Sequence, residues 1–266
     1  MNSLKITVIT ATYNSGATIA DTLNSVVSQT YSNIEHIIVD GKSSDNTIDI
    51  VRSFADKYRS RGMELKWISE KDNGIYDAMN KGINLADGEV IGLLNSDDFY
   101  SASNILSKVA EVFSKAKKEG NKLDAVYGDI HYVKSDNLHK CVRYYSSAGF
   151  KRWKMRLGFM PAHPSFYCRR ETYRQHGLYD TDFRIAADFE QLLRLIFIHG
   201  ITTSYIKADF VTMRTGGASS SGFSSHRRIY SEHRKAYRKN GVYSNFFLEG
   251  LRYISKIIEI CKANIN

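Results

Sequence analysis

The feature that most constrains this chain is a regular alternation of strand-like and helix-like segments over its first hundred residues. Four apolar segments, at residues 5–11, 35–40, 65–69 and 89–95, are predicted strands, and the last is apolar enough to be buried on both faces. Short polar turns follow them, and apolar residues then recur at helical spacing, as in residues 18–29. This pattern predicts a parallel sheet with helices on both faces, and ligands bind beyond the carboxyl ends of such strands.

The pattern changes in the second hundred residues. Residues 124–133 and 142–145 are predicted antiparallel strands, which would make the sheet mixed. A helix is expected at 189–198, and the segments 201–205 and 211–214 are expected to return to the sheet as strands. The basic, aromatic stretch at residues 150–159, between these parts, shows no clear periodicity.

The domain prediction follows from these segments. The first 215 residues are expected to form one α/β domain, with residues 1–100 as a nucleotide-binding half and residues 101–215 as an acceptor-side half. Residues 216–266 are expected to form a basic helical C-terminal extension, with helices at 229–239 and 246–261 after a loop rich in Gly and Ser.

The net charge of +9 is unevenly distributed along the 266 residues. Residues 1–150 hold 17 basic and 19 acidic side chains, whereas residues 200–266 hold 11 basic and 4 acidic ones. The basic excess therefore lies in the C-terminal part, which favours an anionic partner there: nucleic acid, an acidic lipid surface or a phosphorylated substrate.

Cysteine use and hydropathy set the expected compartment. The three cysteines are scattered and have no metal-ligand spacing. The N-terminus does not resemble a secretory signal, and no apolar stretch approaches the roughly 20 residues that span a bilayer. We therefore expect a cytoplasmic protein. A peripheral position at the inner face of the plasma membrane stays open.

The strongest candidate for chemistry is the tetrapeptide Asn95, Ser96, Asp97 and Asp98, directly after the fourth predicted strand. Two adjacent carboxylates repel each other unless a cation or hydrogen-bond donors neutralise them, and oxygen-rich sites suit Mg²⁺ or Mn²⁺. A diphosphate leaving group needs such an ion. The alternative is a solvated turn that caps the next helix.

Polar residues also follow the first three predicted strands. Asp40, at the tip of the second strand, is placed to accept a hydrogen bond from a nucleobase or ribose, or else to form a structural turn. Thr10 and Thr12 lie at the end of the first strand, and Asp72 and Gly74 lie at the third strand-to-helix junction. Each of these segments alone is a weak signal.

Two residues further along are candidates for proton transfer and for substrate contact. Asp188 lies in the first turn of a predicted helix, where the helix dipole alone would stabilise a carboxylate, and its functional interpretation is a general base that deprotonates an acceptor hydroxyl. Glu190 would point away from Asp188, so it is not favoured as the base. His163, between two prolines, is either structural or in contact with the acceptor or diphosphate.

Five segments in order over residues 6–195 resemble family 2 glycosyltransferases. They are VITATYN at 8–14, VDGKSSDNT at 39–47, SEKDNGIYDAMNKG at 69–82, LNSDD at 94–98 and FRIAADF at 183–189. The resemblance implies a GT-A fold, a divalent metal and an inverting single displacement, in bacterial surface-polysaccharide or glycolipid assembly. Asn95 stands where many relatives carry the first Asp of the D-x-D signature, so the charged metal contacts would fall to Asp97 and Asp98.

The resulting hypothesis is an inverting, metal-dependent glycosyltransferase. Its predicted site comprises Thr10, Thr12, Asp40, Asp72, Gly74, Asn80, Asn95 and Ser96 for the nucleotide, Asp97 and Asp98 for Mn²⁺ or Mg²⁺, Asp188 as catalytic base and His163 as an acceptor or diphosphate contact. The favoured donor is a UDP-sugar, and the expected acceptor is a saccharide or a lipid-linked hydroxyl compound.

Two other functions compete with this hypothesis. A sugar-1-phosphate nucleotidyltransferase would also bind nucleotides over a parallel sheet, but residues 10–16 lack the basic phosphate loop it needs. A nucleic-acid-binding protein would explain the basic C-terminal part but not the carboxylates at successive strand tips, so no specific nucleic acid is expected. The apolar face of residues 246–258 either contacts an anionic membrane or packs on the core.

Overall fold

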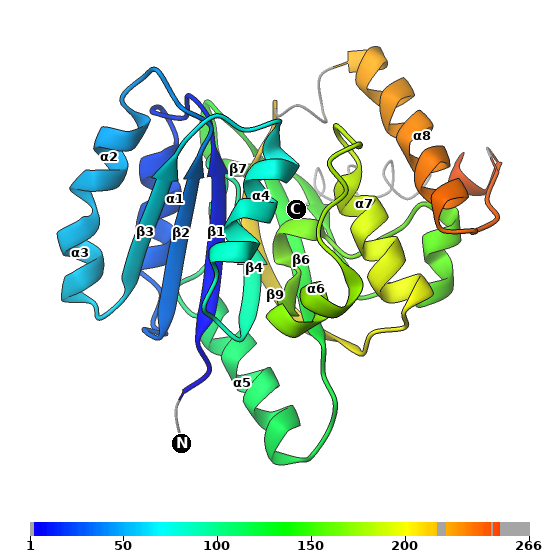
Figure 1. Ribbon diagram of the computed structural model, residues 1–266, viewed down its shortest axis with the longest axis horizontal. Helices are drawn as coiled ribbons and strands as arrows, with labels where there is room; N and C mark the ends of the chain where they lie inside the picture. The colour runs from blue at the N-terminus through cyan, green and yellow to red at the C-terminus, as the bar shows by residue number, and fades with distance from the viewer. Residues whose placement is uncertain (1–2, 217–221, 246, 251–266) are drawn as a thin grey trace.

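The computed structural model describes residues 3–216, 222–245 and 247–250 and contains one mixed sheet flanked by helices (Figure 1). The strand order is β3-β2-β1-β4-β8-β6-β9-β5, and β7 pairs with β6 outside this path. The strands are β1 (Ile6–Thr12), β2 (Ile34–Asp40), β3 (Glu64–Ser69), β4 (Val90–Leu93), β5 (Phe99–Tyr100), β6 (Ala125–Lys134), β7 (Asn137–Tyr145), β8 (Tyr167–Arg169) and β9 (Thr203–Arg214).

The first half of the sheet is parallel, as predicted. β1 lies between β2 and β4, and β3 forms the outer edge beside β2. Every residue of β1, β2 and β4 is buried, because helices cover both faces. In this register Thr12 lies opposite Asp40, so the carboxyl ends of β1 and β2 are level.

The second half mixes strand directions. The short β8 runs antiparallel to both β4 and β6, and β6 then pairs in parallel with β9. Two predicted strands, 201–205 and 211–214, are in fact parts of the single strand β9. β5 pairs with β9 through Phe99 opposite Thr212, which brings the end of β9 beside the loop that follows β4.

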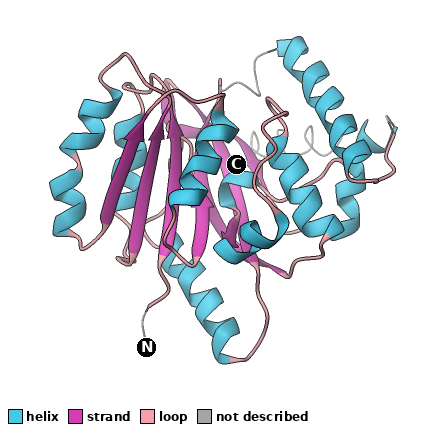
Figure 2. Ribbon diagram, in the orientation of Figure 1, coloured by secondary structure: helices cyan, strands magenta, loops and turns pink. Residues whose placement is uncertain are grey.

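The helices form two layers, seen in cyan on either side of the magenta sheet in Figure 2. One hydrophobic cluster packs α1, α2, α3 and α5 on one face, and a second packs α4, α6, α7 and α8 on the other. Their bounds are α1 (Ile19–Val27), α2 (Thr47–Ser53), α3 (Ala55–Ser60), α4 (Ile75–Leu85), α5 (Ile105–Lys118), α6 (Arg170–His176), α7 (Ala187–Leu192) and α8 (Gly222–Lys239). Short 3₁₀ turns, η1 (Arg152–Leu157) and η2 (His163–Ser165), interrupt the connection between β7 and β8.

Several predicted helix boundaries shift. The helix predicted at 189–198 is α7 followed by a π-helical turn, η3 (Leu193–Ile198). α8 begins at Gly222, inside the stretch predicted as a Gly- and Ser-rich loop. Of the predicted helix 246–261, residues 247–250 are helical and the remainder lies outside the described residues.

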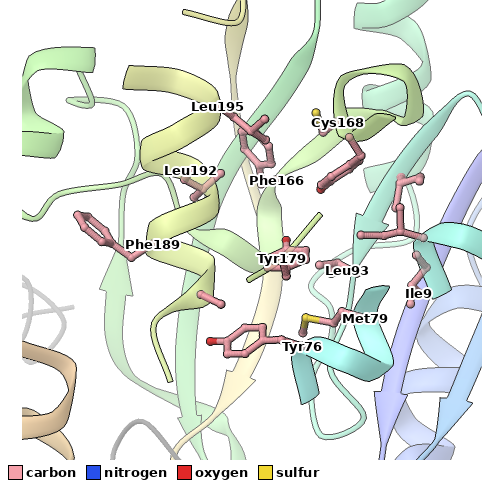
Figure 3. Close-up of a cluster of buried hydrophobic side chains, with 14 of the residues drawn as sticks. Ile9, Tyr76, Met79, Leu93, Phe166, Cys168, Tyr179, Phe189, Leu192 and Leu195 are labelled. Atoms are coloured by element: carbon pink, nitrogen blue, oxygen red, sulfur yellow. The ribbon is translucent and has the colours of Figure 1, made fainter. Parts of the chain in front are cut away.

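The core between the sheet and the second helix layer is rich in aromatic side chains. Figure 3 shows Tyr76 and Tyr179 between the sheet residue Leu93 and the α7 residues Phe189 and Leu192. The Tyr76 and Tyr179 rings stack with their centroids 5.8 Å apart. These buried rings connect α4 to the segment that leads into α7, and so they fix where α7 begins relative to the carboxyl ends of the strands.

Candidate active site

The loops after β1, β2 and β3 converge at the carboxyl edge of the sheet. A methyl group built on Gly41, directly after β2, would lie 2.6 Å from Asp72 Oδ2 and 3.4 Å from the Tyr13 ring. Tyr13 is 64% exposed, and Asp72 is half-buried with its Oδ1 accepting the Gly74 N–H at 2.9 Å. Gly74 itself has φ 113°, a conformation that favours glycine. An aromatic face and a carboxylate therefore meet here.

Thr12 and Asp40 are buried next to each other at the carboxyl ends of β1 and β2. The Thr12 hydroxyl is buried and has no hydrogen-bond partner among the described residues. Asp40 is fully buried, and its carboxylate accepts hydrogen bonds from the Ser43 N–H at 3.0 Å and from the Ser69 hydroxyl at 2.6 Å. Buried hydroxyls are ordinarily paired, so the Thr12 Oγ1 is an open hydrogen-bonding position at the end of β1.

Two non-glycine residues at the same edge have positive φ. Asn14 has φ 48° and Lys42 has φ 66°. Contacts between the two loops hold the first of these, because the Asn14 N–H donates to Ser43 Oγ at 2.7 Å and Asn14 Oδ1 accepts the Ser44 N–H at 2.9 Å. Such backbone conformations cluster at ligand-binding sites, where surrounding contacts offset their cost.

The loop at residues 95–98 is tied to its neighbours. Ser96 Oγ lies 2.8 Å from Ser15 Oγ, and Asn95 Nδ2 donates to Asp98 Oδ2 at 3.0 Å. Asp98 is buried and also accepts the Arg214 N–H at 3.3 Å. Burial, with the neighbouring charge of Asp97, raises the pKa of Asp98 to about 8.

Asp97 differs from Asp98 in exposure and in partners. Its side chain is half-buried, and within the described residues no hydrogen bond from another residue to its carboxylate is found. The Arg214 guanidinium donates instead to the backbone carbonyl of Asp97 and to Asp21. Burial raises the pKa of Asp97, and the Arg214 charge offsets part of that effect. Asp97 is thus a carboxylate left open toward the loop edge.

The fit of a divalent cation can be judged from these ligands. The described residues contain no group of three or more His, Cys, Asp or Glu side chains placed to hold a metal ion. One open carboxylate suits a cation that takes most of its remaining ligands from water and the phosphates of a bound nucleotide, which is a common arrangement for Mg²⁺. The residues present therefore fit a metal bound together with substrate.

Asp188 lies in the first turn of α7, which packs in the same helix layer as α4. The Tyr76 hydroxyl, from the start of α4, donates to the carbonyl of Ile185 at 2.6 Å, so the start of α7 lies beside the helix that follows β3. Burial raises the pKa of Asp188, and the nearby His163 ring acts in the opposite direction. His163 Nε2 lies 2.8 Å from the Tyr179 hydroxyl, and burial lowers the pKa of His163.

Three residues of the predicted site have interior roles. Thr10 is fully buried, with Oγ1 3.0 Å from His36 Nε2. Asn80 exchanges two hydrogen bonds with the backbone of Tyr179, at 2.8 and 2.9 Å. Asp98 accepts hydrogen bonds from the Asn95 side chain and from the Arg214 N–H. Thr10 and Asp98 are buried and Asn80 is half-buried, and the roles predicted for them as ligand contacts stay predictions.

Sequence patterns do not single out every residue at this edge. Tyr13 belongs to the motif at residues 8–14, and its exposed aromatic ring directly after β1 makes it a candidate for stacking on a base. Arg214 and Glu232 come from distant segments, and only the fold brings them beside Asp97 and the start of α7. No spacing in the sequence connects them with these segments.

A mixed α/β sheet flanked by helices on both faces is the architecture of the GT-A class of glycosyltransferases. The S. aureus TarS fragment 1–349, solved with UDP-GlcNAc, matches with a TM-score of 0.68 at 18% identity and covers 88% of this chain and 65% of that one. At this identity the likeness shows the fold. The family model described as Glycosyl transferase family 2 matches residues 7–183, and the chain belongs to that family.

Other relatives agree with this assignment. A PGL/p-HBAD biosynthesis glycosyltransferase of Mycobacterium bovis is 30% identical over 199 residues, which cover 75% of this chain and 72% of the relative. The mannosyltransferase PcManGT from Pyrobaculum calidifontis, solved with GDP-Man and Mn²⁺, matches with a TM-score of 0.64 at 19% identity, covering 90% of this chain and 64% of that one. The chain is therefore a glycosyltransferase, which displaces the nucleotidyltransferase alternative.

A membrane-spanning helix needs roughly 20 predominantly apolar residues. Among the described residues, no helix is both long and apolar enough to cross a bilayer.

Proposed function

We propose that this protein transfers a sugar from a nucleoside diphosphate donor, with a UDP-sugar favoured, to a hydroxyl acceptor with inversion at the anomeric carbon. The observation that carries the proposal is the Tyr76 to Ile185 hydrogen bond of 2.6 Å. It joins α4, which follows β3 and Asp72, to the loop before Asp188, and so supports a place for the candidate base near the carboxyl edge of the sheet. The donor-binding residues and the candidate base could then act on the same substrate pair.

The donor would lie along the carboxyl edge of the sheet. Tyr13 would stack on the base, and Thr12, Asp40 and Asp72 would contact the nucleoside, with Ser96 and Asn95 towards the phosphates. Asp40 would act through the loop it holds, because its oxygens already accept from Ser43 and Ser69. A Mn²⁺ or Mg²⁺ ion held by Asp97 would neutralise charge on the leaving diphosphate.

Asp188 would take the proton of the acceptor hydroxyl as that oxygen attacks the anomeric carbon. The new carbon–oxygen bond forms as the bond from the anomeric carbon to the diphosphate oxygen breaks, and the bonding electrons leave with the nucleoside diphosphate. Tyr179 is buried and the half-buried His163 ring packs against it, so the two rings would limit the access of water to Asp188. A raised pKa makes Asp188 a stronger base than an ordinary aspartate once it is ionised.

A lipid-linked or glycolipid acceptor is supported by the relatives. One acts in PGL/p-HBAD biosynthesis, and another, from Methanococcus voltae, is a glucuronosyltransferase named for a dolichyl N-acetyl-α-D-glucosaminyl phosphate and is 30% identical over 200 residues. Trp153, Tyr243 and Phe247 are 55%, 67% and 83% exposed. Arg156 contacts the backbone of Tyr243 at 3.2 Å, so basic and aromatic groups share this side of the molecule, as in peripheral membrane proteins.

Calorimetric titration with a panel of nucleoside diphosphates, with and without Mn²⁺, tests the donor site. We expect one nucleotide to bind in a metal-dependent way and Asp97→Ala to abolish that dependence. Asp136→Asn, which changes an exposed carboxylate in the turn between β6 and β7, is the matched control and should bind normally. If no nucleotide binds with Mn²⁺ present, the donor site proposed here is wrong.

Flotation with liposomes tests the membrane contact. The wild-type protein should float with vesicles that contain anionic lipid, and the double variant Trp153→Ser and Tyr243→Ser should float less. Equal flotation of both proteins, or none with the wild type, would count against a membrane contact through these side chains.

A further inference from the structure

The loop that leads into α7 is held by a residue from the opposite end of the chain. The Glu232 carboxylate, on α8, accepts three consecutive backbone N–H groups, those of Arg184 at 3.1 Å, Ile185 at 2.9 Å and Ala186 at 2.8 Å. The start of α7 has no side-chain cap of its own. Glu232 therefore supplies the acceptor that the amides before Asp188 need.

Other side chains on the same face of α8 hold the preceding part of this loop. Lys235 and Lys239 follow Glu232 by three and seven positions, a spacing that places all three on one helix face. The Lys235 ammonium group donates to the carbonyl of Asp182 at 3.0 Å, and that of Lys239 donates to Asp180 Oδ2 at 2.6 Å. This face of α8 thus contacts the loop from residue 180 to residue 186.

The loop is held from its other side as well. Tyr76, on α4, donates to the carbonyl of Ile185, while Glu232 accepts the N–H of the same residue. The backbone two to four residues before Asp188 is therefore fixed between α4 and α8, which Figure 1 shows standing on opposite sides of α7. His233, next to Glu232, stacks on Phe189 with ring centroids 3.8 Å apart, so the contact continues past Asp188.

We propose that Glu232 is a positioning residue for Asp188, and that α8 is part of the catalytic apparatus and not an appendage to it. The proposal rests on the proposed function, in which Asp188 is the base. Glu232 touches no substrate in this arrangement. It fixes the backbone that leads to Asp188, and its charge is close enough to act on the Asp188 carboxylate.

The titratable groups around Asp188 come from four elements. They are Tyr76 of α4, His163 of η2, Tyr179 of the segment before α7 and Glu232 of α8. Burial is the main reason that the pKa of Asp188 is raised, His163 lowers it and Glu232 raises it. Removing the Glu232 charge, or loosening the loop so that water reaches Asp188, would lower that pKa in both cases.

Two measurements that need no substrate test the proposal. Amide hydrogen exchange of residues 184–186 reports the three hydrogen bonds, and carbon-13 NMR of protein labelled at the aspartate carboxyls reports the pKa of Asp188, assigned with Asp188→Asn. Glu232→Gln keeps the side-chain volume and removes the charge, and Glu232→Ala removes the acceptor. Arg238→Gln, at an exposed position of α8, changes the charge by one and is the control.

In Glu232→Gln we expect exchange at residues 184–186 to be about tenfold faster and the pKa of Asp188 to be lower, with both values unchanged in Arg238→Gln. Unchanged exchange in Glu232→Gln would overturn the proposal. Faster exchange with an unchanged Asp188 pKa would also overturn it, because Glu232 would then be a structural contact only. If Glu232→Ala does not fold, Glu232→Gln alone decides.

Failure of the proposed function would look different. In that case nucleoside diphosphates would not bind to the wild-type protein, or Asp188→Asn would keep full transfer activity, whatever the exchange and NMR data show for Glu232.

Discussion

At Gly41 the chain has no room for a side chain. A Cβ there would lie 2.6 Å from Asp72 Oδ2, closer than two such atoms approach. The Asp72 carboxylate can therefore keep its position only if residue 41 is glycine. The same position is within ordinary contact of Tyr13. Tyr13 and Asp72, which we propose as contacts of the nucleoside, therefore both lie next to Gly41.

Gly41→Ala should weaken nucleoside diphosphate binding about tenfold, or about 1.4 kcal/mol, because Asp72 must move away. Calorimetric titration measures the change. Gly149→Ala, whose added methyl group would meet no atom closer than 3.8 Å, should bind as the wild type does. Equal affinity in Gly41→Ala would show that Asp72 is not a nucleoside contact.

Asp188→Asn should lower kcat by roughly 10² to 10⁴, the usual contribution of a general base, and leave nucleotide affinity unchanged. Steady-state kinetics and titration together check both parts. Asp182→Asn, an exposed residue of the same loop, is the control and should keep wild-type kcat. Loss of nucleotide binding in Asp188→Asn would contradict a role confined to proton transfer.

The rate should also depend on pH in a defined direction. The base acts only when ionised, and burial raises the pKa of Asp188 above its ordinary value. As pH falls through that raised pKa, kcat should fall, at a higher pH than the ~3.9 of a free aspartate side chain would give. A rate profile that stays flat down to that value would exclude Asp188 as the base.

At the scale of single elements, buried apolar segments were the most predictable. β1, β2 and β4 were predicted because an apolar run between polar turns leaves few other structures for the chain. β9 was predicted as two strands because residues 206–210 include polar side chains. It continues because β6 supplies hydrogen bonds along its length, with register shifts near Asp129 that sequence patterns do not reveal.

The candidate site rests on local patterns in the same way. Asp97 and Asp188 were predicted because each belongs to a short local motif, and their roles stay predictions. The burial and hydrogen bonding of Asp98 could not be predicted, since one of its partners is the Arg214 N–H at the far end of β9. The sequence likewise cannot show that Asn80, which is predicted to contact the nucleotide, makes two hydrogen bonds with the Tyr179 backbone.

His36 gives β2 a pH-dependent contribution to stability. Its ring is fully buried, lies 2.7 Å from the Tyr58 hydroxyl of α3, and has a pKa lowered to about 3 by burial. The unfolded chain takes up a proton near pH 6.5 and the folded chain does not. The free energy of unfolding should therefore fall by about 1.4 kcal/mol per pH unit from about pH 6 towards pH 3 on account of this residue.

Urea unfolding between pH 7 and pH 4 measures this slope. His36→Gln should be less stable at pH 7 and should show a smaller loss on acidification, whereas His139→Gln, at an exposed position, should retain the wild-type slope. The same slope in all three proteins would mean that His36 is not the group responsible.

At the scale of the whole molecule, α8 belongs to the main core. Ala236 and Tyr237 join the hydrophobic cluster that contains α4, α6 and α7, and the Tyr237 hydroxyl donates to the carbonyl of Met155 at 2.7 Å. Two of the basic side chains predicted to meet an external partner, Lys235 and Lys239, bind the loop before α7.

A chain cut after residue 215 should therefore melt about 10 °C lower than the full chain, because it leaves Phe189 and its neighbours without cover. Differential scanning calorimetry tests this expectation. An unchanged Tm would support the predicted boundary between an α/β domain and an independent C-terminal extension.

The contact of Glu232 with residues 184–186 also bears on how the protein is made. A nascent chain presents the segments of the donor side first, and the loop before Asp188 emerges well before α8 is synthesised. Until α8 has formed, the three amides lack their acceptor and the base lacks its fixed backbone. The enzyme would thus acquire its donor side early in translation and its competence for proton transfer only near the end.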